Sequence, residues 1–382
     1  MKTVGIVTGS RADYGIYRPI MEAIRSDREF QLEIAVTGMH LSPRFGTSEE
    51  IVADGFEITE RVPIPLANDT PGDIGKAIGA GVSGFADLFA RWCPDVLLIQ
   101  GDRFEVFSAA VASLPFGIPL AHMHGGELTL GAIDDPLRHS ITKIAHLHFV
   151  STDSYARRVA QLGEEDWRIT VTGAPGLDNL HNIDLIPGDL LSRDLGYPAG
   201  SSPLLVTLHP ETRERQATQD LISTTLAVLE TYTDPIIFTA PNADTYGNEI
   251  LQAVEAFCGS RENASLFPNL GTLRYFSLMA VSCVMMGNSS SGIVEAASFE
   301  LPVINVGARQ QGRLAGANVV HVAAQEAEMR AALSRVLDPG FRRALRKMAN
   351  PYGDGHAAGR VIEVLRNTQI DQRLLNKGFV DR

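Results

Sequence analysis

Short runs of apolar residues, rich in Val and Ile, recur along the chain and alternate with stretches that have helical spacing. This pattern is typical of parallel strands that crossover helices bury on both faces. It therefore indicates an α/β fold made of two similar Rossmann-like halves. We predict strands at residues 4–7, 32–37, 96–100, 119–122, 147–151 and 169–172, and at 204–208, 236–239, 281–286, 302–306 and 319–322.

The domain boundaries follow from the positions of residues that break regular structure. Pro and Gly are most densely clustered between residues 181 and 203, which indicates a linker. We predict an N-terminal Rossmann-like domain over residues 1–180, a linker over 181–203 and a C-terminal Rossmann-like domain over 204–356. A C-terminal helix and tail should fill 357–382. Open parallel sheets bind ligands at the carboxyl ends of their strands, so we expect the two domains to face a cleft.

Composition and charge exclude several classes of protein. The chain has 382 residues, of which 45% are apolar and 20% are charged, and its net charge is −12. These values exclude disorder, and the negative charge argues against a nucleic-acid partner. Cys93, Cys258 and Cys283 show no paired spacing, which favours a reducing cytoplasm over a disulfide framework. The first apolar run is too short for a signal peptide or a membrane span.

The first predicted strand leads into a polar turn, residues 9–15, and then into a predicted helix. A strand, a tight turn and a helix present free backbone N–H groups to an anion. Arg11 adds a forked donor that suits a phosphate. The alternative is that Arg11 and Asp13 pair with each other across the turn. The turn lacks the GxGxxG fingerprint, so a dinucleotide cofactor is not indicated.

Ionisable residues cluster where the other strands of the first half end. His40 follows the second strand, and Asp102 and Arg103 follow the third. The fourth strand leads into seven ionisable residues within eighteen positions, a density that is costly to desolvate without a function. These residues are His122, His124, Glu127, Asp134, Asp135, Arg138 and His139. His122 and His124 share one side of a strand and would allow a metal site, but no further His or Cys cluster completes it, and we predict no metal.

The strand ends of the second half favour binding of a nucleotide. His209 follows the strand at 204–208, and three serines, Ser289, Ser290 and Ser291, follow the strand at 281–286. Three hydroxyls at the start of a helix form a phosphate site, whereas a helix cap would need only one serine. Glu295, which we expect on the first turn of that helix, suits a ribose diol. Arg309 and Arg313 add two forked donors near the same end of the sheet.

Eight segments, in order over nearly the whole chain, resemble those of the hydrolysing UDP-N-acetylglucosamine 2-epimerases of sialic-acid biosynthesis. They are GSRADYG (9–15), QGDRFEV (100–106), HMHGGE (122–127), IDDPLRHSITKIAHLH (133–148), LHPET (208–212), GNSSSGIVEAASF (287–299), PVINVGARQQGR (302–313) and NPYGDGHAAGR (350–360). The resemblance implies a glycosyltransferase-B-like fold and release of free N-acetylmannosamine and UDP. It also implies anti elimination to a 2-acetamidoglucal, water addition, no cofactor, and a homodimer or homotetramer.

The resemblance also implies roles for individual residues. Asp102, Asp134 and His209 would be catalytic, and Arg11, His40 and Arg103 would line the substrate. Animal-type relatives have HxEGGE where this chain has His124 followed by Gly-Gly-Glu127, so either His124 or Glu127 is the candidate base. Gln100 stands where those relatives have a His. The nucleotide would be bound by Ser289, Ser290, Ser291, Glu295, Arg309 and Arg313, and the substrate also by Asp135 and Arg138.

Several related activities remain open from the sequence. Bacterial relatives with these motifs act on diacetylbacillosamine or on GDP-linked sugars on the way to legionaminic acid, and the motifs do not separate these substrates. A glycosyltransferase of the same fold would need an acceptor. A non-hydrolysing epimerase would have an EAG motif in place of HGGE (124–127), and a non-catalytic sensor would not need the acids. We therefore predict a hydrolysing 2-epimerase of a nucleotide-linked acetamido sugar.

Overall fold

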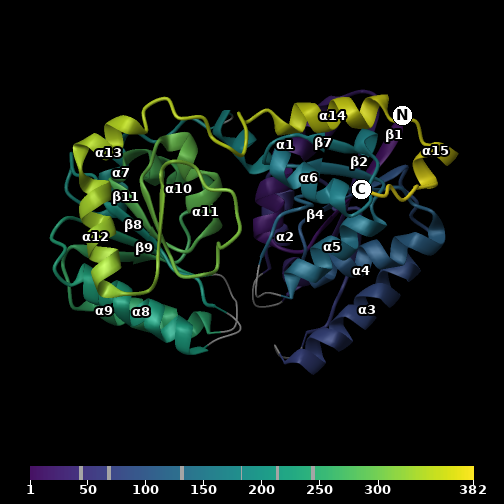
Figure 1. Ribbon diagram of the computed structural model, residues 1–382. Coiled ribbons are helices and arrows are strands. Elements are labelled where there is room, and N and C mark those ends of the chain that lie inside the picture. Colours follow the sequence, from purple (N-terminus) through teal and green to yellow (C-terminus); the bar gives the residue numbers. More distant parts are fainter. Residues whose placement is uncertain (43–45, 67–69, 130–132, 182, 212–214, 242–245) are drawn as a thin grey trace. The chain divides into compact units, whose positions relative to one another are not determined.

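The computed structural model describes the chain except for residues 43–45, 67–69, 130–132, 182, 212–214 and 242–245. The chain forms two compact units (Figure 1). The first contains Met1–Glu127, Ile133–His181 and Tyr352–Arg382, and the second is built on Asn182–Pro351. The chain thus leaves the first unit within the predicted linker and returns to it at Tyr352, five residues before the predicted C-terminal segment.

The first unit contains a sheet of seven strands, and neighbouring strands pair in parallel. Its strand order is β3-β2-β1-β4-β5-β6-β7. Short apolar runs form these strands because both faces of the sheet are buried. The strands are β1 Lys2–Thr8, β2 Phe30–Thr37, β3 Glu60–Val62, β4 Val96–Gln100, β5 Leu120–Met123, β6 Leu147–Val150 and β7 Ile169–Val171.

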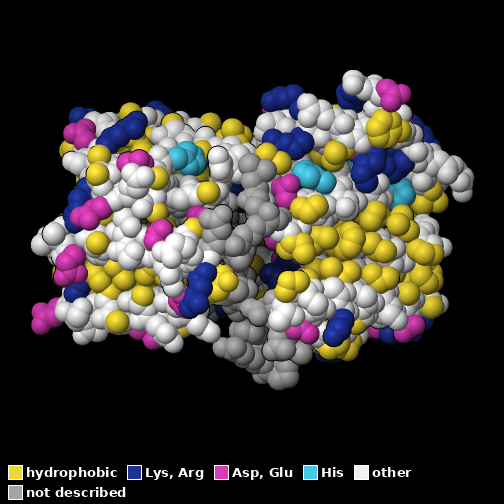
Figure 2. Space-filling view, turned by 60° about the horizontal axis from the view of Figure 1, so that its bottom comes forward, with side chains coloured by type: hydrophobic (Ala, Val, Ile, Leu, Met, Phe, Trp, Pro, Cys, Tyr) yellow, Lys and Arg dark blue, Asp and Glu magenta, His cyan; other side chains and the backbone are white. Residues whose placement is uncertain are grey.

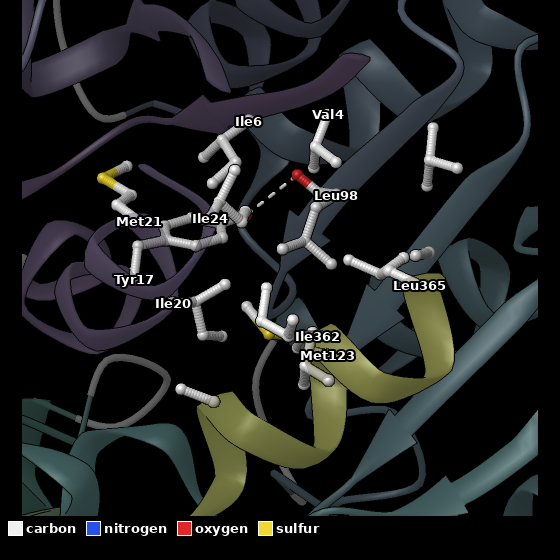
Figure 3. Packing of buried hydrophobic residues seen from close by; sticks show 14 of the residues in the cluster. Val4, Ile6, Tyr17, Ile20, Met21, Ile24, Leu98, Met123, Ile362 and Leu365 are labelled. Atoms are coloured by element: carbon white, nitrogen blue, oxygen red, sulfur yellow. Dashed lines mark hydrogen bonds between the residues drawn. The ribbon is translucent and has the colours of Figure 1, made fainter. Parts of the chain in front are cut away.

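Alternate residues of these strands enter two separate cores. Leu98 and Met123 pack with α1 (Arg11–Ser26) and α14 (Ala357–Asn367) on one face, as Figure 3 shows. Leu97 and Leu120 pack with the helices α3 (Pro71–Phe89), α4 (Phe104–Ser113) and α5 (Asp134–Ile144) on the other. The remaining elements of this unit are η1 Gly38–Leu41, α2 Ser48–Ala53, η2 Leu114–Phe116, α6 Asp153–Gln161, η3 Asp166–Arg168, η4 Pro175–His181 and α15 Gln372–Leu375.

The second unit repeats this plan with a parallel sheet of six strands in the order β10-β9-β8-β11-β12-β13. Its strands and helices pack around an apolar core. The strands are β8 Leu204–Thr207, β9 Ile236–Thr239, β10 Ala264–Phe267, β11 Val284–Gly287, β12 Val303–Val306 and β13 Val319–Val322. The helices are α7 Gly188–Leu195, α8 Arg215–Leu229, α9 Gly247–Gly259, α10 Gly271–Val281, α11 Ser290–Val294, η5 Ala296–Phe299, α12 Glu326–Leu337 and α13 Pro339–Ala344.

All eleven predicted strands and the helix after residue 357 are confirmed, with ends that shift by up to three residues. Two strands escaped prediction, β3 and β10, and both lie at the edge of a sheet. Edge strands are buried less completely, so their sequences lack a continuous apolar run. The predicted start of β11 at residue 281 is wrong because α10 extends to Val281.

The first unit exposes a broad area of hydrophobic side chains, seen on the right in Figure 2. Its strongly exposed large hydrophobic residues include Leu114 and Phe116 in η2, at 52% and 40% exposure. None of the described helices is long and apolar enough to cross a membrane.

Candidate active site

In each sheet the strand order reverses at one point, between β1 and β4 in the first unit and between β8 and β11 in the second. Open α/β sheets bind ligands outside the carboxyl ends of the strands at such a reversal, because the crossover helices diverge there. Arg11 and Asp102 follow the two strands in the first unit, and His209 and Ser289 follow those in the second. The candidate residues therefore lie where this topology favours a ligand.

The turn after β1 is held by Ser10 and Asp13. Ser10 caps α1 by accepting a hydrogen bond from the backbone N–H of Asp13, and Asp13 accepts one from the N–H of Gly9 at 3.2 Å. Burial raises the pKa of Asp13, whereas the charge of Arg103 opposes that rise. Arg11 pairs with Glu50 at 2.9 Å, so the predicted alternative of an Arg11–Asp13 pair is wrong.

His40 is buried beneath the end of β1, in η1. One ring nitrogen lies 3.0 Å from the hydroxyl of Thr8 and the other lies 2.8 Å from the hydroxyl of Thr47. Burial lowers the pKa of His40 to about 4, so the ring is neutral near pH 7. His40 thus places a neutral imidazole at this edge of the sheet and does not provide a positive charge that could bind an anion.

Asp102 and Arg103 are adjacent in sequence but have different partners. Arg103 forms an ion pair with Glu105 at 3.3 Å, and the carboxylate of Glu105 is almost completely buried. Gly38 has a φ of +52°, and a Cβ there would meet Glu105 at 2.8 Å. Only glycine allows this close approach. Glu105 therefore positions the guanidinium of Arg103 between the ends of β2 and β4.

Arg138 of α5 connects the ends of two strands. Its guanidinium forms an ion pair with the carboxylate of Asp102 and donates to the carbonyl of Glu127 at 2.9 Å. It also lies 3.6 Å from Asp135, which in turn lies 3.6 Å from His139. The helix begins at Asp134. Asp134, Asp135, Arg138 and His139 therefore all lie on its first two turns. A buried guanidinium with several partners fixes the strand ends rigidly.

His124 and Glu127 form a close pair in the loop after β5. Nδ1 of His124 lies 2.8 Å from Oε1 of Glu127, and Ser151, which follows β6, donates its hydroxyl to the same carboxylate oxygen at 3.4 Å. Both side chains are mostly buried, at 15% and 5% exposure. Glu127 lies in neither a helix nor a strand. Its position next to His124 therefore depends on the conformation of the loop.

His122 is separate from this pair. It lies within β5, with one ring nitrogen 2.8 Å from the carbonyl of Gly101 and the other 3.2 Å from the hydroxyl of Thr142. Burial lowers its pKa to about 3. His124 lies beyond the strand end, so the expectation that His122 and His124 share one strand face is wrong. The role of His122 in the structure is to fix the loop that contains Asp102.

In the second unit, Asn288 joins the ends of β8 and β11. Its side chain accepts from the N–H of His209 at 2.7 Å and donates to the carbonyl of His209 at 2.8 Å. Its own carbonyl accepts from Arg309 at 3.1 Å and from Gln310 at 2.9 Å. Burial, together with the charge of Arg309, lowers the pKa of His209 to about 3. One asparagine thus places both His209 and Arg309.

The serines have different positions around α11. Ser289 caps this short helix by accepting from the N–H of Ser291 at 3.3 Å, and Ser290 begins it. Glu295 follows the end of α11, so its predicted place on the first turn is wrong. Tyr275 of α10 also lies here: burial raises its pKa to about 12, and hydrogen bonding with Thr207 and Ser291 opposes that rise.

The structure therefore gathers the predicted residues into one group per unit. The first contains Asp102, Arg103, His124, Glu127, Asp135 and Arg138, with Asp134 at the start of α5. The second contains His209, Ser289 and Arg309, and Arg313 follows on the same loop, where its N–H bonds the carbonyl of Gln310 at 3.2 Å. Sequence reasoning missed Glu105, Ser151, Tyr275, Asn288 and Gln310. Of these, Glu105, Asn288 and Gln310 lie inside segments that the motifs already marked, whereas Ser151 and Tyr275 do not.

Comparisons with known proteins agree with this geometry. The family model described as UDP-N-acetylglucosamine 2-epimerase matches residues 22–366. The chain is 38% identical to a GDP/UDP-N,N'-diacetylbacillosamine 2-epimerase (hydrolyzing) from Campylobacter jejuni, over 100% of this chain and 99% of the relative. It is 36% identical to a UDP-N,N'-diacetylbacillosamine 2-epimerase (hydrolyzing) from Legionella pneumophila, over 97% of each.

A solved structure supports the same fold. The UDP-GlcNAc 2-epimerase from Neisseria meningitidis, bound to UDP-GlcNAc, superposes with a TM-score of 0.84 at 17% identity and covers 96% of this chain and 100% of that one. At this identity the likeness concerns the fold alone. The whole-length relatives and the family model together show that this chain belongs to the UDP-N-acetylglucosamine 2-epimerase family.

Proposed function

We propose that this protein is a hydrolysing 2-epimerase that converts a nucleoside-diphosphate 2-acetamido sugar into the free 2-epimer and the nucleoside diphosphate. The observation that supports it most strongly is the full-length similarity to two relatives named as hydrolysing 2-epimerases. The two groups of residues at the strand ends provide chemistry that such a reaction needs. The first group supplies carboxylates and imidazoles, and the second supplies hydroxyls and guanidinium groups.

The chemistry assigns a different task to each group. Elimination removes the proton from carbon 2 of the sugar and breaks the bond between carbon 1 and the diphosphate oxygen. Water then adds a hydroxyl to carbon 1 and a proton returns to carbon 2 from the opposite face. Because the two proton transfers occur on opposite faces, two acid–base groups are required. Our candidates are His124, Glu127, Asp102, Asp134 and His209.

The second group is our candidate for holding the leaving diphosphate. Negative charge accumulates on the diphosphate as its bond to carbon 1 breaks, and forked donors and hydroxyls stabilise that charge. Arg309 is fixed by the carbonyl of Asn288, and Ser289 and Ser290 lie at the end of β11. Arg11, His40 and Arg103 would line the sugar from the first unit, with Asp135 and Arg138. Ser291, Glu295 and Arg313 complete the nucleotide set.

The relatives favour a 2,4-diacetamido sugar over UDP-N-acetylglucosamine. The two hydrolysing relatives described above are named for diacetylbacillosamine, at 38% and 36% identity. UDP-N-acetylglucosamine 2-epimerases from Neisseria meningitidis and Escherichia coli K12 are 30% and 24% identical. We therefore expect turnover of UDP- or GDP-linked diacetylbacillosamine to exceed that of UDP-N-acetylglucosamine. This makes the sugar of legionaminic-acid synthesis the first substrate to test.

The test is a proton-NMR time course in heavy water with each of three donors and no acceptor. The donors are UDP-diacetylbacillosamine, GDP-diacetylbacillosamine and UDP-N-acetylglucosamine. We expect free 2-epimerised sugar with deuterium at carbon 2, together with released nucleoside diphosphate. Turnover that begins only when a sugar acceptor is added would identify a glycosyltransferase instead. A product that stays joined to its nucleotide would identify a non-hydrolysing epimerase.

A further inference from the structure

His124 is held in a backbone conformation that histidine rarely adopts. Its φ is +61°, in the left-handed region, where a residue with a side chain has a cost of about 1 kcal/mol or more. The surrounding loop enforces this conformation. The N–H of His124 donates to the carbonyl of Phe149 at 3.2 Å, and Arg158 donates to the carbonyl of Gly126. Such strain, held by several contacts, is typical of a functional position.

The hydrogen bonds of His124 determine which ring nitrogen holds the proton. The carboxylate of Glu127 can only accept a hydrogen bond, so the contact of 2.8 Å between its Oε1 and Nδ1 of His124 requires a proton on Nδ1. Ser151 lies 3.3 Å from the same nitrogen and donates to Glu127. In the neutral ring the other nitrogen, Nε2, therefore has a free lone pair.

That second nitrogen has no partner among the residues that the structure describes. Nε2 of His124 is buried and makes no hydrogen bond within the part of the chain that the structure describes. Buried polar atoms almost always have a partner. An imidazole nitrogen that is oriented through its other nitrogen by a carboxylate, and is itself left unpaired, has the arrangement of a general base. It also lies at the ligand-binding edge of the sheet, next to β4.

We propose that His124 is the base of the elimination and that Glu127 and Ser151 are its positioning residues. This assignment rests on the proposed function. Nε2 takes the proton from carbon 2 as the carbon 1–oxygen bond breaks, a double bond forms between carbons 1 and 2, and the electron pair leaves with the diphosphate. The imidazolium that results is stabilised by Glu127. Glu127 thus acts through His124 and touches no reacting atom.

The left-handed backbone at His124 permits a clean test. Glycine adopts a φ of +61° without strain, so His124→Gly removes the imidazole and preserves the loop. We expect kcat to fall at least about 100-fold, while the Kd for UDP or GDP stays within about twofold. Free imidazole in solution should restore activity to His124→Gly, because it can occupy the vacated space. Full activity in His124→Gly without imidazole would overturn the assignment.

Glu127→Gln tests whether Glu127 only positions His124 or is itself the base. The amide can still accept from Nδ1 but has no charge to stabilise the imidazolium, so we expect a lower kcat, a KM near that of the wild type and no rescue by imidazole. Rescue of both variants would overturn the division of roles. His321→Gly, which removes an exposed imidazole on the edge strand β13, is the control for nonspecific effects of imidazole. A wild-type protein that turns over none of the three donors would instead contradict the proposed function.

An independent readout is the protonation of the ring itself. Nitrogen-15 NMR distinguishes a protonated from an unprotonated imidazole nitrogen, and the signals missing from His124→Gly identify those of His124. In the neutral ring we expect a proton on Nδ1 and none on Nε2. A proton on Nε2 in the wild type would overturn the assignment whether or not a substrate is known.

Discussion

Single residues decide whether the strand ends of this protein can approach one another. Gly287, the last residue of β11, has a φ of +138° and lies directly against the carbonyl of Thr207 at the end of β8. A Cβ at this position would overlap that carbonyl. The pair of strand ends that places Asn288 and Ser289 therefore requires the absence of a side chain at residue 287.

Gly287→Ala should accordingly destabilise the protein by about 3 kcal/mol, because overlap with backbone cannot be relieved by a change of rotamer. The free energy of unfolding from urea titration measures this loss. Gly259→Ala is the matched control, since Gly259 ends α9 with open space around it, and it should change the free energy by less than about 1 kcal/mol. Equal stability of Gly287→Ala and the wild type would contradict the prediction.

At the scale of elements, α5 connects the loops after β4 and β5. Arg138 of this helix contacts both the carboxylate of Asp102 and the carbonyl of Glu127. The fork geometry of the guanidinium matters here because two acceptors lie in different directions. A lysine donates from a single nitrogen, so it cannot reproduce the contacts that the two nitrogens of the fork make.

Arg138→Lys should therefore lower kcat at least about tenfold, because a displacement of the catalytic loop by a fraction of an ångström is costly in rate. Nucleotide affinity should be unchanged, since the residues that we propose to bind the nucleotide are on the second unit. Steady-state kinetics and calorimetric titration with UDP or GDP give the two values. Arg157→Lys, at an exposed position on α6, is the control. Wild-type kcat in Arg138→Lys would show that this helix does not position the site.

At the scale of the whole molecule, the C-terminal segment completes the first unit. Arg168 is buried and donates to the carbonyls of Leu374, Arg373 and Asn376, which anchor α15. Lys377 and Lys143 both pair with the buried Glu164, at 2.7 and 2.6 Å. These ion pairs lower the pKa of Glu164 to about 2, although burial opposes that shift. Residues remote in sequence thus close the core beside β6 and β7.

Buried histidines make the stability of both units depend on pH. Burial lowers the pKa of His40 and His146 to about 4 and that of His122 and His209 to about 3, whereas a histidine in the unfolded chain has a pKa of about 6.5. Between pH 6.5 and 4 the unfolded chain binds more protons than the folded protein. The free energy of unfolding must therefore fall as the pH falls. Each of these histidines contributes up to about 1.4 kcal/mol for each pH unit.

We expect the urea midpoint to be clearly lower at pH 5 than at pH 7.5, as followed by circular dichroism. His40→Gln should reduce the pH dependence, because an amide can keep one bond to a threonine and does not titrate. The carboxylates of Asp13 and Asp178, whose pKa values are raised by burial, act in the opposite direction. An unchanged midpoint between pH 5 and 7.5 would refute this account.

The sequence by itself determined the elements and the kinds of chemistry. Continuous apolar runs predicted every central strand, because strands covered on both faces have few polar positions. Edge strands β3 and β10 could not be found in this way. The motifs identified Asp102, His124, Glu127 and the serines, because polar residues at the ends of buried strands stand out against apolar neighbours.

Only the tertiary structure decided which of these groups meet. The sequence left Arg11 free to pair with Asp13, but α2 brings Glu50 closer. It could not choose between His124 and Glu127, because their contact depends on a left-handed residue and on Ser151 from another strand. Long-range pairing of this kind is set by strand order and loop geometry, which leave no periodic signal in the chain. The roles of individual residues therefore follow from the fold, and the family and its chemistry from the sequence.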